Sequence, residues 1–194
     1  MKGMKKMKKI ITITLVLIIA TGLMAGCSDT GEQEQISPTS TPIITIEPTA
    51  ELDPGYGAVG SFENQGVEIE QMLIYAIQDE YLARAEYEYL INELIAGNPF
   101  INIIKAEENH ISMLLPLFEA YGFEAPEDTS AEHLIPVESI TAALETGVQA
   151  EIDNIAMYEN FLEGELPDDV REVFIELRDA SENHLAAFER KLSR

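Results

Sequence analysis

The sequence predicts an all-α protein whose main domain is an up-down bundle of four helices. Apolar side chains recur every three or four residues through four long stretches between about residues 68 and 192. Glycine and proline residues separate these stretches. Two of the stretches repeat a motif centred on Glu-Asn-His, at residues 106–114 and 180–188. About 130 residues are enough for such a bundle to bury a core.

Residues 1–26 have the composition of a secretory signal peptide. Five lysines precede an apolar run from Ile10 to Ala20, and small residues follow it. The run is short for a membrane-spanning helix, which needs about 20 residues. Residues 23–27, Leu-Met-Ala-Gly-Cys, resemble a bacterial lipoprotein lipobox in which Met24 replaces the usual leucine. The resemblance implies lipidation of Cys27, and an uncleaved N-terminal anchor is the alternative. Both place the domain on the extracytoplasmic side of the cell membrane, with the membrane as its partner.

Residues 27–66 are predicted to be a disordered, acidic linker. They are rich in Ser, Thr, Pro and Glu, and no helical or alternating pattern persists. The linker would hold the domain of residues 67–194 away from the membrane. Cys27 is the only cysteine, so an internal disulfide framework is excluded.

The first two predicted helices span about residues 68–96 and 99–121. Leu73, Ile77 and Leu90 mark the apolar face of the first, and Gly97 follows its end. Asn98 is predicted to cap the second, with proline in its first turn. Pro116 lies inside the second helix and is expected to kink it or to end it early.

The last two predicted helices span about residues 137–163 and 168–192. Gly164 follows the third helix, and acidic residues open the fourth, where they favour the helix dipole. A longer polar connection, residues 122–136, joins the second helix to the third. His133 in this connection is expected to be a solvated loop residue.

The formal net charge of −23 restricts the class of partner. From Cys27 onward seven cationic residues stand against thirty-five acidic ones, a balance of −28. Such a surface repels nucleic acid and attracts small cations. The sequence therefore predicts no nucleic-acid partner.

The second half of the domain repeats the first. Glu80 and Glu151 are 71 residues apart, as are Tyr87 and Tyr158, whereas His110 and His184 are 74 apart. A duplicated helical hairpin, packed about an approximate twofold axis, would bring equivalent residues close together.

The repeat supplies candidate metal ligands from all four helices. Glu107 stands three residues before His110, which places both on one helix face. Bundles that hold two iron or manganese ions take such a Glu-x-x-His pair from two helices and a single Glu from each of the others. The candidates are Glu80, Glu107, His110, Glu151 and His184. Ser181 replaces the second expected Glu, and Glu182 lies about 200° around the helix from His184.

The donor set suits iron, manganese or zinc, and either one ion or two sharing Glu107. Structural alternatives exist for each residue. Glu80 could pair with Arg84, since a buried carboxylate needs a counter-charge or a metal. The histidines could be hydrogen-bonded core residues. Tyr87 and Tyr158 could be core residues, donors of a hydrogen bond to a ligand, or residues with a redox role.

Several motifs resemble the ferritin-like family called "domain of unknown function 2202". They are Asp79-Glu80-Tyr81, Pro99-Phe100, Ala106-Glu107 with His110, Gly147-Val148 with Ala150-Glu151, and Asn183-His184-Leu185. The resemblance covers about residues 68–192 and implies a ferritin-like four-helix bundle. Related ferritin-like and rubrerythrin-like di-iron proteins oxidise ferrous iron or reduce peroxide, and they normally carry both Glu-x-x-His pairs.

The leading functional hypothesis is a membrane-tethered, extracytoplasmic metal-binding protein, with iron as the expected metal. If it turns over, it is expected to be a di-iron-type oxidoreductase acting on a small inorganic substrate: ferrous ion, oxygen or peroxide. Two alternatives stay open, a non-enzymatic surface bundle with a buried polar network and a metal-sequestering protein without turnover. The sequence leaves open whether the bundle forms a homodimer.

Overall fold

A computed structural model describes residues 55–63 and 66–194. The predicted signal peptide, the lipidation site at Cys27 and most of the predicted linker lie outside these residues. The described part is helical, with no strand in those two ranges. Among the described residues, no helix combines the length and apolarity needed to cross a membrane.

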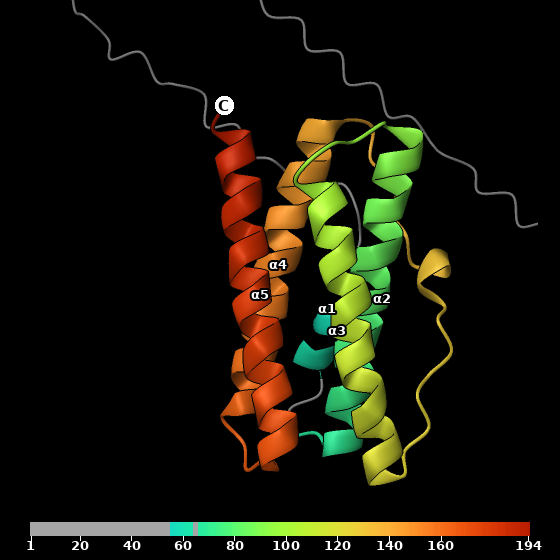
Figure 1. The fold of residues 1–194 in the computed structure, drawn as a ribbon, viewed down its shortest axis with the longest axis vertical. Helices are drawn as coiled ribbons and strands as arrows, with labels where there is room; N and C mark the ends of the chain where they lie inside the picture. The colour runs from blue at the N-terminus through green and yellow to red at the C-terminus, as the bar shows by residue number, and fades with distance from the viewer. Residues whose placement is uncertain (1–54, 64–65) are drawn as a thin grey trace, which may run out of the picture. The chain divides into compact units, whose positions relative to one another are not determined.

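Four long helices form the bundle: α2 (Ile69–Glu93), α3 (Phe100–Tyr121), α4 (Ile140–Leu162) and α5 (Asp168–Leu192) (Figure 1). The predicted all-α bundle is confirmed, with helix bounds within about three residues of those expected. α4 starts later than predicted because Ser139 caps it, its Oγ accepting a hydrogen bond from the Ala142 N–H at 3.1 Å. α3 starts at Phe100 with Pro99 as its N-cap, so Asn98 does not cap it.

The end of α3 differs from one expectation and agrees with another. The helix continues past Pro116 to Tyr121, so the predicted early end is wrong. Because proline has no N–H, the carbonyl of Ser112 lacks its usual helical hydrogen bond. Ser112 and Pro116 are both exposed, so water can bond to that carbonyl instead. Gly122 ends the helix as predicted, in the left-handed region at φ 71°.

The helices do not alternate in direction, which corrects the predicted up-down order. α2 runs up, α3 and α4 run down, and α5 runs up (Figure 1). The contacts agree: Tyr87 of α2 bonds to Glu151 of α4 while Tyr158 bonds to Glu80, so these two helices are antiparallel. The connection of residues 122–139 is long enough to return along the whole bundle before α4 starts.

This connection is held against the bundle along its length. It contains a short 3-10 helix, η1 (Ser130–Glu132), that contacts α2. Asp128 forms an ion pair with Arg84 of α2. His133 is half-buried and stacks on Tyr56, with ring centroids 3.8 Å apart, so the prediction that it is a solvated loop residue is wrong.

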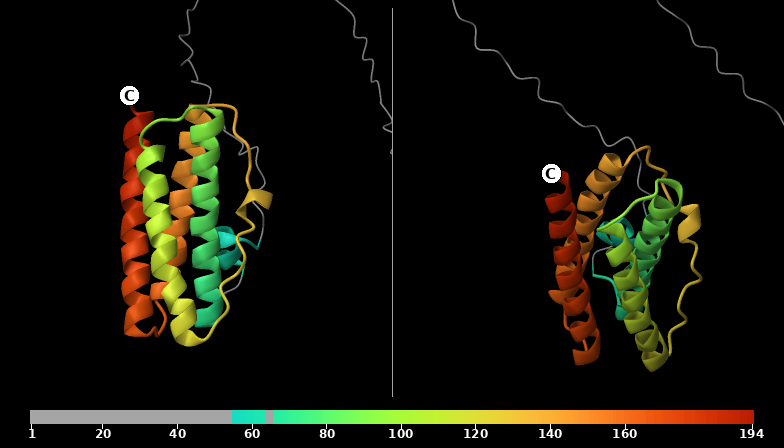
Figure 2. Two further views of the ribbon diagram at one scale, coloured as in Figure 1. Left: turned by 45° about the vertical axis from the view of Figure 1, so that its right-hand side comes forward. Right: turned by 45° about the horizontal axis from the view of Figure 1, so that its top comes forward.

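A short helix, α1 (Gly57–Phe62), lies within the segment predicted to be linker and packs against α2 and α4 (Figure 2). The Ala58 N–H donates to Asp79 Oδ1 at 2.9 Å. Gly57 has φ 57°, and a Cβ there would lie 2.8 Å from the same Asp79 oxygen. The ordered domain therefore begins before residue 67, because a tertiary contact holds α1 in place.

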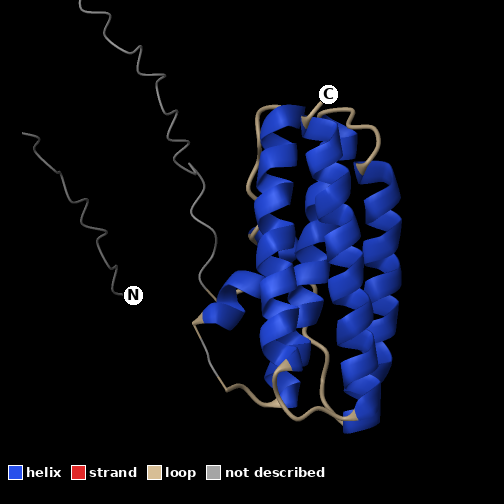
Figure 3. Ribbon diagram, turned by 90° about the vertical axis from the view of Figure 1, so that its left-hand side faces the viewer, coloured by secondary structure: helices blue, strands red, loops and turns tan. Residues whose placement is uncertain are grey.

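The core consists of two apolar layers separated by a polar one. One layer is centred on Tyr158, Phe161 and Phe174, and the other on Tyr87, Phe100 and Phe188. The rings in each set lie 5.5–6.5 Å apart. Along α3, α4 and α5 the predicted ligands fall between the residues of the two layers. On α2, Glu80 lies directly before Tyr81, the last residue of the first layer on that helix. Figure 3 shows how closely the helices align along the bundle.

We predict that Gly147→Ala destabilises the fold. A Cβ at Gly147 would lie 3.0 Å from the Phe188 ring, which is 0% exposed and fixed by its aromatic neighbours. The overpacking costs about 1–3 kcal/mol, against about 1 kcal/mol gained in helix propensity. The expected net loss is about 1 kcal/mol in urea unfolding of the purified protein. The control is Gly97→Ala, where nothing lies within 4 Å and no loss is expected. Equal stability of the Gly147 variant and the native protein would contradict the prediction.

Candidate metal centre

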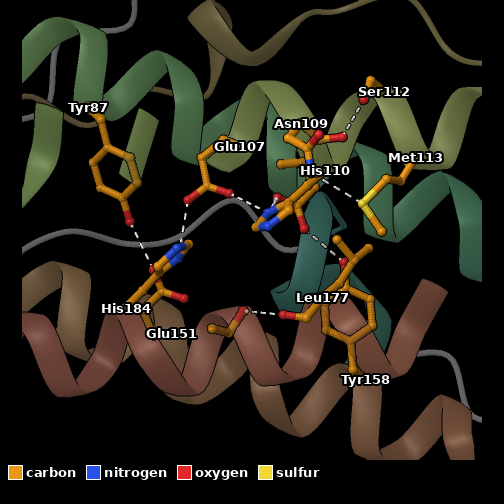
Figure 4. A network of polar contacts seen from close by, with 12 residues as sticks. Tyr87, Glu107, Asn109, His110, Ser112, Met113, Glu151, Tyr158, Leu177 and His184 are labelled. Atoms are coloured by element: carbon orange, nitrogen blue, oxygen red, sulfur yellow. Dashed lines mark hydrogen bonds and ion pairs between the residues drawn. The ribbon is translucent and has the colours of Figure 1, made fainter. Parts of the chain in front are cut away.

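The four long helices bring all five predicted ligands together in the polar layer. Figure 4 shows four of them, Glu107, His110, Glu151 and His184. α2 supplies Glu80, α3 supplies Glu107 and His110, α4 supplies Glu151, and α5 supplies His184. Their exposed fractions are only 2% for Glu80, 3% for Glu107, 5% for His110, 4% for Glu151 and 8% for His184. The side chains therefore do not form a solvated acidic surface.

Glu80, Glu107 and His110 form the first group. His110 Nδ1 lies 3.0 Å from Glu80 Oε2 and 2.9 Å from Glu107 Oε2. The second group contains Glu107, Glu151 and His184, with His184 Nδ1 at 3.3 Å from Glu107 Oε1 and 3.4 Å from Glu151 Oε1. Within each group one ligand atom per residue lies within 4.8 Å of the others, so each could hold a metal ion.

Glu107 belongs to both groups and uses a different oxygen in each. The two imidazole rings face each other with centroids 5.9 Å apart, and the Glu107 carboxylate contacts the Nδ1 atom of both. A carboxylate held in this way can serve as a bridge between two ions or as a ligand of one. The expectation that Glu107 lies at the centre of the set therefore agrees with the geometry.

Two buried tyrosines fix the outer carboxylates. The Tyr158 hydroxyl donates to Glu80 Oε1 at 2.9 Å, and the Tyr87 hydroxyl donates to Glu151 Oε1 at 3.1 Å. Each tyrosine thus binds the carboxylate that belongs to the opposite half of the repeat. This exchange is what an approximate twofold axis through the centre produces. Two of the roles considered for the tyrosines hold together: they are buried core residues and donors to a candidate ligand.

Arg84 is not the partner of Glu80. Its guanidinium pairs with Asp128 and lies over the Tyr81 ring, 5.5 Å from the ring centroid. In the described ranges, the only cationic groups in ion-pair contact with the three buried carboxylates are the imidazoles. The arginine alternative is therefore wrong for Glu80, and the imidazoles or a metal ion must balance the charge.

The pKa values of Glu80, Glu107 and His110 depend on one another because the three groups are buried in contact. Burial is the largest single effect on the pKa of Glu80 and raises it. The hydrogen bond and charge of His110, with the hydrogen bonds to Glu107 and Tyr158, together outweigh burial and leave the pKa below its usual value. Burial raises the pKa of Glu107 well above its usual value, and the neighbouring Glu80 charge adds to the effect. Burial lowers the pKa of His110, yet its bonds to Glu107 and Glu80 bring it to about 10. The imidazolium form of His110 thus takes the place that a metal cation could take.

The expected second carboxylate of the twofold pair is absent. Ser181 is 2% exposed, and its hydroxyl donates to the Leu177 carbonyl within its own helix at 3.2 Å. Glu182 is exposed, as its angle around the helix predicted. The centre therefore contains three carboxylates and two imidazoles, a set of oxygen and nitrogen donors that fits iron, manganese or zinc.

Comparison with known proteins shows the family to which the chain belongs. The model of the family described as "Uncharacterized protein domain (DUF2202)" matches residues 68–194. The chain belongs to this family. The match begins after α1, so that helix lies outside the residues the DUF2202 family model covers. No curated protein matches the chain.

Two solved structures are similar to the DUF2202 chain. The hypothetical protein MJ0754 from Methanococcus jannaschii DSM 2661 is 25% identical, with a TM-score of 0.58, over 67% of this chain and 83% of that one. The conserved hypothetical protein rv2844 from Mycobacterium tuberculosis is 18% identical, with a TM-score of 0.56, over 63% of this chain and 89% of that one. Both similarities support the helical fold and carry no function.

Sequence reasoning missed Glu86 of α2. This side chain is half-buried and lines a small cavity between α2 and α4. Burial, and then the nearby Glu151 charge, raise the pKa of Glu86 to about 7. Its position four residues before Leu90, on a helix with many acidic residues, did not distinguish it from a solvated glutamate. Only the covering loop, which is distant in sequence, reveals its burial.

We predict that Glu86→Gln stabilises the metal-free protein in a pH-dependent way. Below about pH 4.5 Glu86 is protonated in both the folded and the unfolded chain and contributes nothing. As pH rises to about 7 the unfolded chain loses this proton first, so the native fold loses stability. The variant should gain about 1–3 kcal/mol over the native protein above pH 7 and nothing near pH 4. Urea midpoints of both proteins across this range provide the measurement.

Glu88→Gln is the control for the change in net charge, because Glu88 is exposed two residues away. It should show little of this gain. A stability difference for the Glu86 variant that does not change with pH would contradict the assigned cause.

Proposed function

We propose that the protein is a ferritin-like metal-binding bundle, with iron as its metal, held on the outer side of the cell membrane. The observation that carries the proposal is the pair of buried Glu/His groups joined by Glu107. Three carboxylates inside an apolar core are costly to bury unless cations balance them. In the metal-free protein, protons on His110 and on Glu107, whose pKa values are both raised, reduce this cost. A bound metal cation would take the place of these protons.

Each of the five residues would have a distinct position in the metal centre. Glu80 and His110 would bind on one side, Glu151 and His184 on the other, and Glu107 would serve both. Bound iron would supply one-electron redox chemistry and coordination positions for a small substrate. The hydroxyls of Tyr158 and Tyr87 orient the two outer carboxylates, and the aromatic layers above and below exclude water.

If the bound metal turns over, the activity is that of an oxidoreductase acting on ferrous ion, oxygen or peroxide. This substrate class follows from the donor set. Metal sequestration without turnover is a second candidate. It is favoured by the absence of the second bridging carboxylate at Ser181, which reduces the negative charge available to stabilise an oxidised centre.

A third candidate is a surface bundle without metal. It is favoured by the hydrogen-bond distances between His110 and its two carboxylates, since an imidazolium can satisfy this half of the centre unaided. His184 lies farther from its carboxylates, at 3.3 and 3.4 Å, and is less well satisfied in the same way. This difference makes the metal interpretation the better one for the second group.

The location is proposed from the N-terminal sequence. Lipidation of Cys27 would attach the chain to the membrane, and residues 28–54 would act as a spacer. The strongly acidic domain would then attract cations at the cell surface.

We predict that the purified protein holds stoichiometric metal by elemental analysis and that Glu107→Ala abolishes uptake, because Glu107 contacts both groups. Glu182→Ala, an exposed acidic residue on the same helix as His184, is the control and should bind as the native protein does. Consumption of oxygen or peroxide after addition of ferrous ion would indicate turnover, and uptake without consumption would indicate sequestration. Full metal uptake by folded Glu107→Ala protein would overturn the ligand assignment.

We also predict that Tyr158→Phe and Tyr87→Phe each weaken metal affinity by about tenfold. Each change removes the hydroxyl that orients one outer carboxylate and leaves the ring packing in place. Competition with a chelator of known affinity measures the effect. Tyr121→Phe, which removes a surface hydrogen bond to Asp169, is the control and should leave affinity unchanged. Native affinity in both buried-tyrosine variants would show that the hydroxyls do not position the ligands.

A further inference from the structure

The ligands of the centre are so deeply buried that a metal ion must cross the wall of the bundle to reach them. The helix pairs α2–α3 and α4–α5 pack closely along their lengths, whereas α2 and α4 make little direct contact. The space between α2 and α4 is covered instead by elements that are not part of the four-helix bundle. This side of the bundle is therefore the one with the fewest helix–helix contacts to cross.

Two elements cover the side between α2 and α4: helix α1 and the loop before α4. α1 closes the part beside Asp79, where the Ala58 N–H bonds to the Asp79 carboxylate. The loop before α4 covers the part beside Glu86, and a cavity lies beneath it. The cavity is lined by Glu86 and Tyr87 of α2, by Thr146 and Gly147 of α4, and by Leu134 and Val137 of the loop, among others. It offers about 20 Å³, room for about one water molecule or a small ion.

Tyr87 links this cavity to the metal centre. It lines the cavity, and its hydroxyl donates to Glu151 Oε1 at 3.1 Å. Glu151 in turn contacts His184 in the second ligand group. One side chain therefore separates the cavity from the first candidate ligand behind it.

Glu86 is the acidic group of the cavity, and no cation of the described residues is paired with it. Within residues 55–63 and 66–194, its carboxylate has neither a hydrogen bond nor an ion pair, and the charge it senses most is the like charge of Glu151. Most other acids on α2 are better placed for water: Glu88 and Glu93 are exposed. A carboxylate that is partly buried, unpaired and beside a cavity is suited to hold a passing cation.

We propose that divalent metal ions reach the centre through the cavity between α2 and α4, and that the Glu86 carboxylate binds them transiently on the way to Glu151. The inference rests on the proposed metal-binding function. It assigns to Glu86 a role in the rate of uptake and none in the final ligand set. Movement of the Tyr87 side chain would open the last step.

The test is a stopped-flow measurement of Co²⁺ uptake by the metal-free protein, followed by the visible absorption of the bound ion. Glu86→Gln should slow uptake by about five- to tenfold, because it removes the attracting charge and keeps the shape of the side chain. Glu86→Asp keeps the charge and should load at nearly the native rate. Glu88→Gln removes an exposed charge of the same helix and should also load at nearly the native rate.

The amount of Co²⁺ bound at equilibrium should be the same in all four proteins. Equal uptake rates in the native protein and Glu86→Gln would overturn the route through this cavity while leaving the metal centre intact. A lower final amount of bound metal in Glu86→Gln would also overturn it, because Glu86 would then belong to the centre itself. If the native protein binds no Co²⁺, the proposed metal-binding function fails together with this inference.

Discussion

The position of the Glu107 carboxylate between His110 and His184 is the constraint on which the rest of the structure depends. Its two oxygens contact one imidazole each, so the four long helices must keep a common spacing around one point. Aromatic layers on both sides remove water from this point, which makes every charge there costly unless it is paired. The bundle therefore encloses three carboxylates whose negative charge is costly to bury unless cations or protons balance it.

Much of this arrangement could be predicted from the sequence, because a duplicated sequence constrains a structure twice. The repeat of Glu-Asn-His and the equal offsets of the glutamates and tyrosines made convergence near a twofold axis the simplest outcome. Helical periodicity placed the four long helices, since each buries one apolar face. The same reasoning identified the five buried polar residues that lie together as candidate ligands, since polar residues on an apolar face are the ones that need an explanation. The metal itself, and any reaction, depend on properties that residue spacing does not determine.

The features that could not be predicted all depend on contacts between residues far apart in the sequence. α1 contains two glycines and no helical pattern, and it is held by Asp79. The direction of α4 depends on a connection that follows α2 with the help of Arg84 and Asp128. The burial of Glu86 results from a loop nearly fifty residues further along the chain. Local propensity carries no information about any of these contacts.

The replacement at Ser181 is where the symmetry of the duplication breaks, and charge suggests why the fold tolerates it. A carboxylate at this position would be the fourth in the layer, against two imidazoles, and the metal-free protein would have one more buried acid to neutralise. Serine instead satisfies its hydroxyl on the Leu177 carbonyl and adds no charge. The same residue lowers the negative charge of the layer, so it stabilises the metal-free bundle and reduces the positive charge that the two candidate metal groups could balance. The asymmetry thus leaves Glu107 as the one carboxylate shared by the two groups that could hold a metal ion.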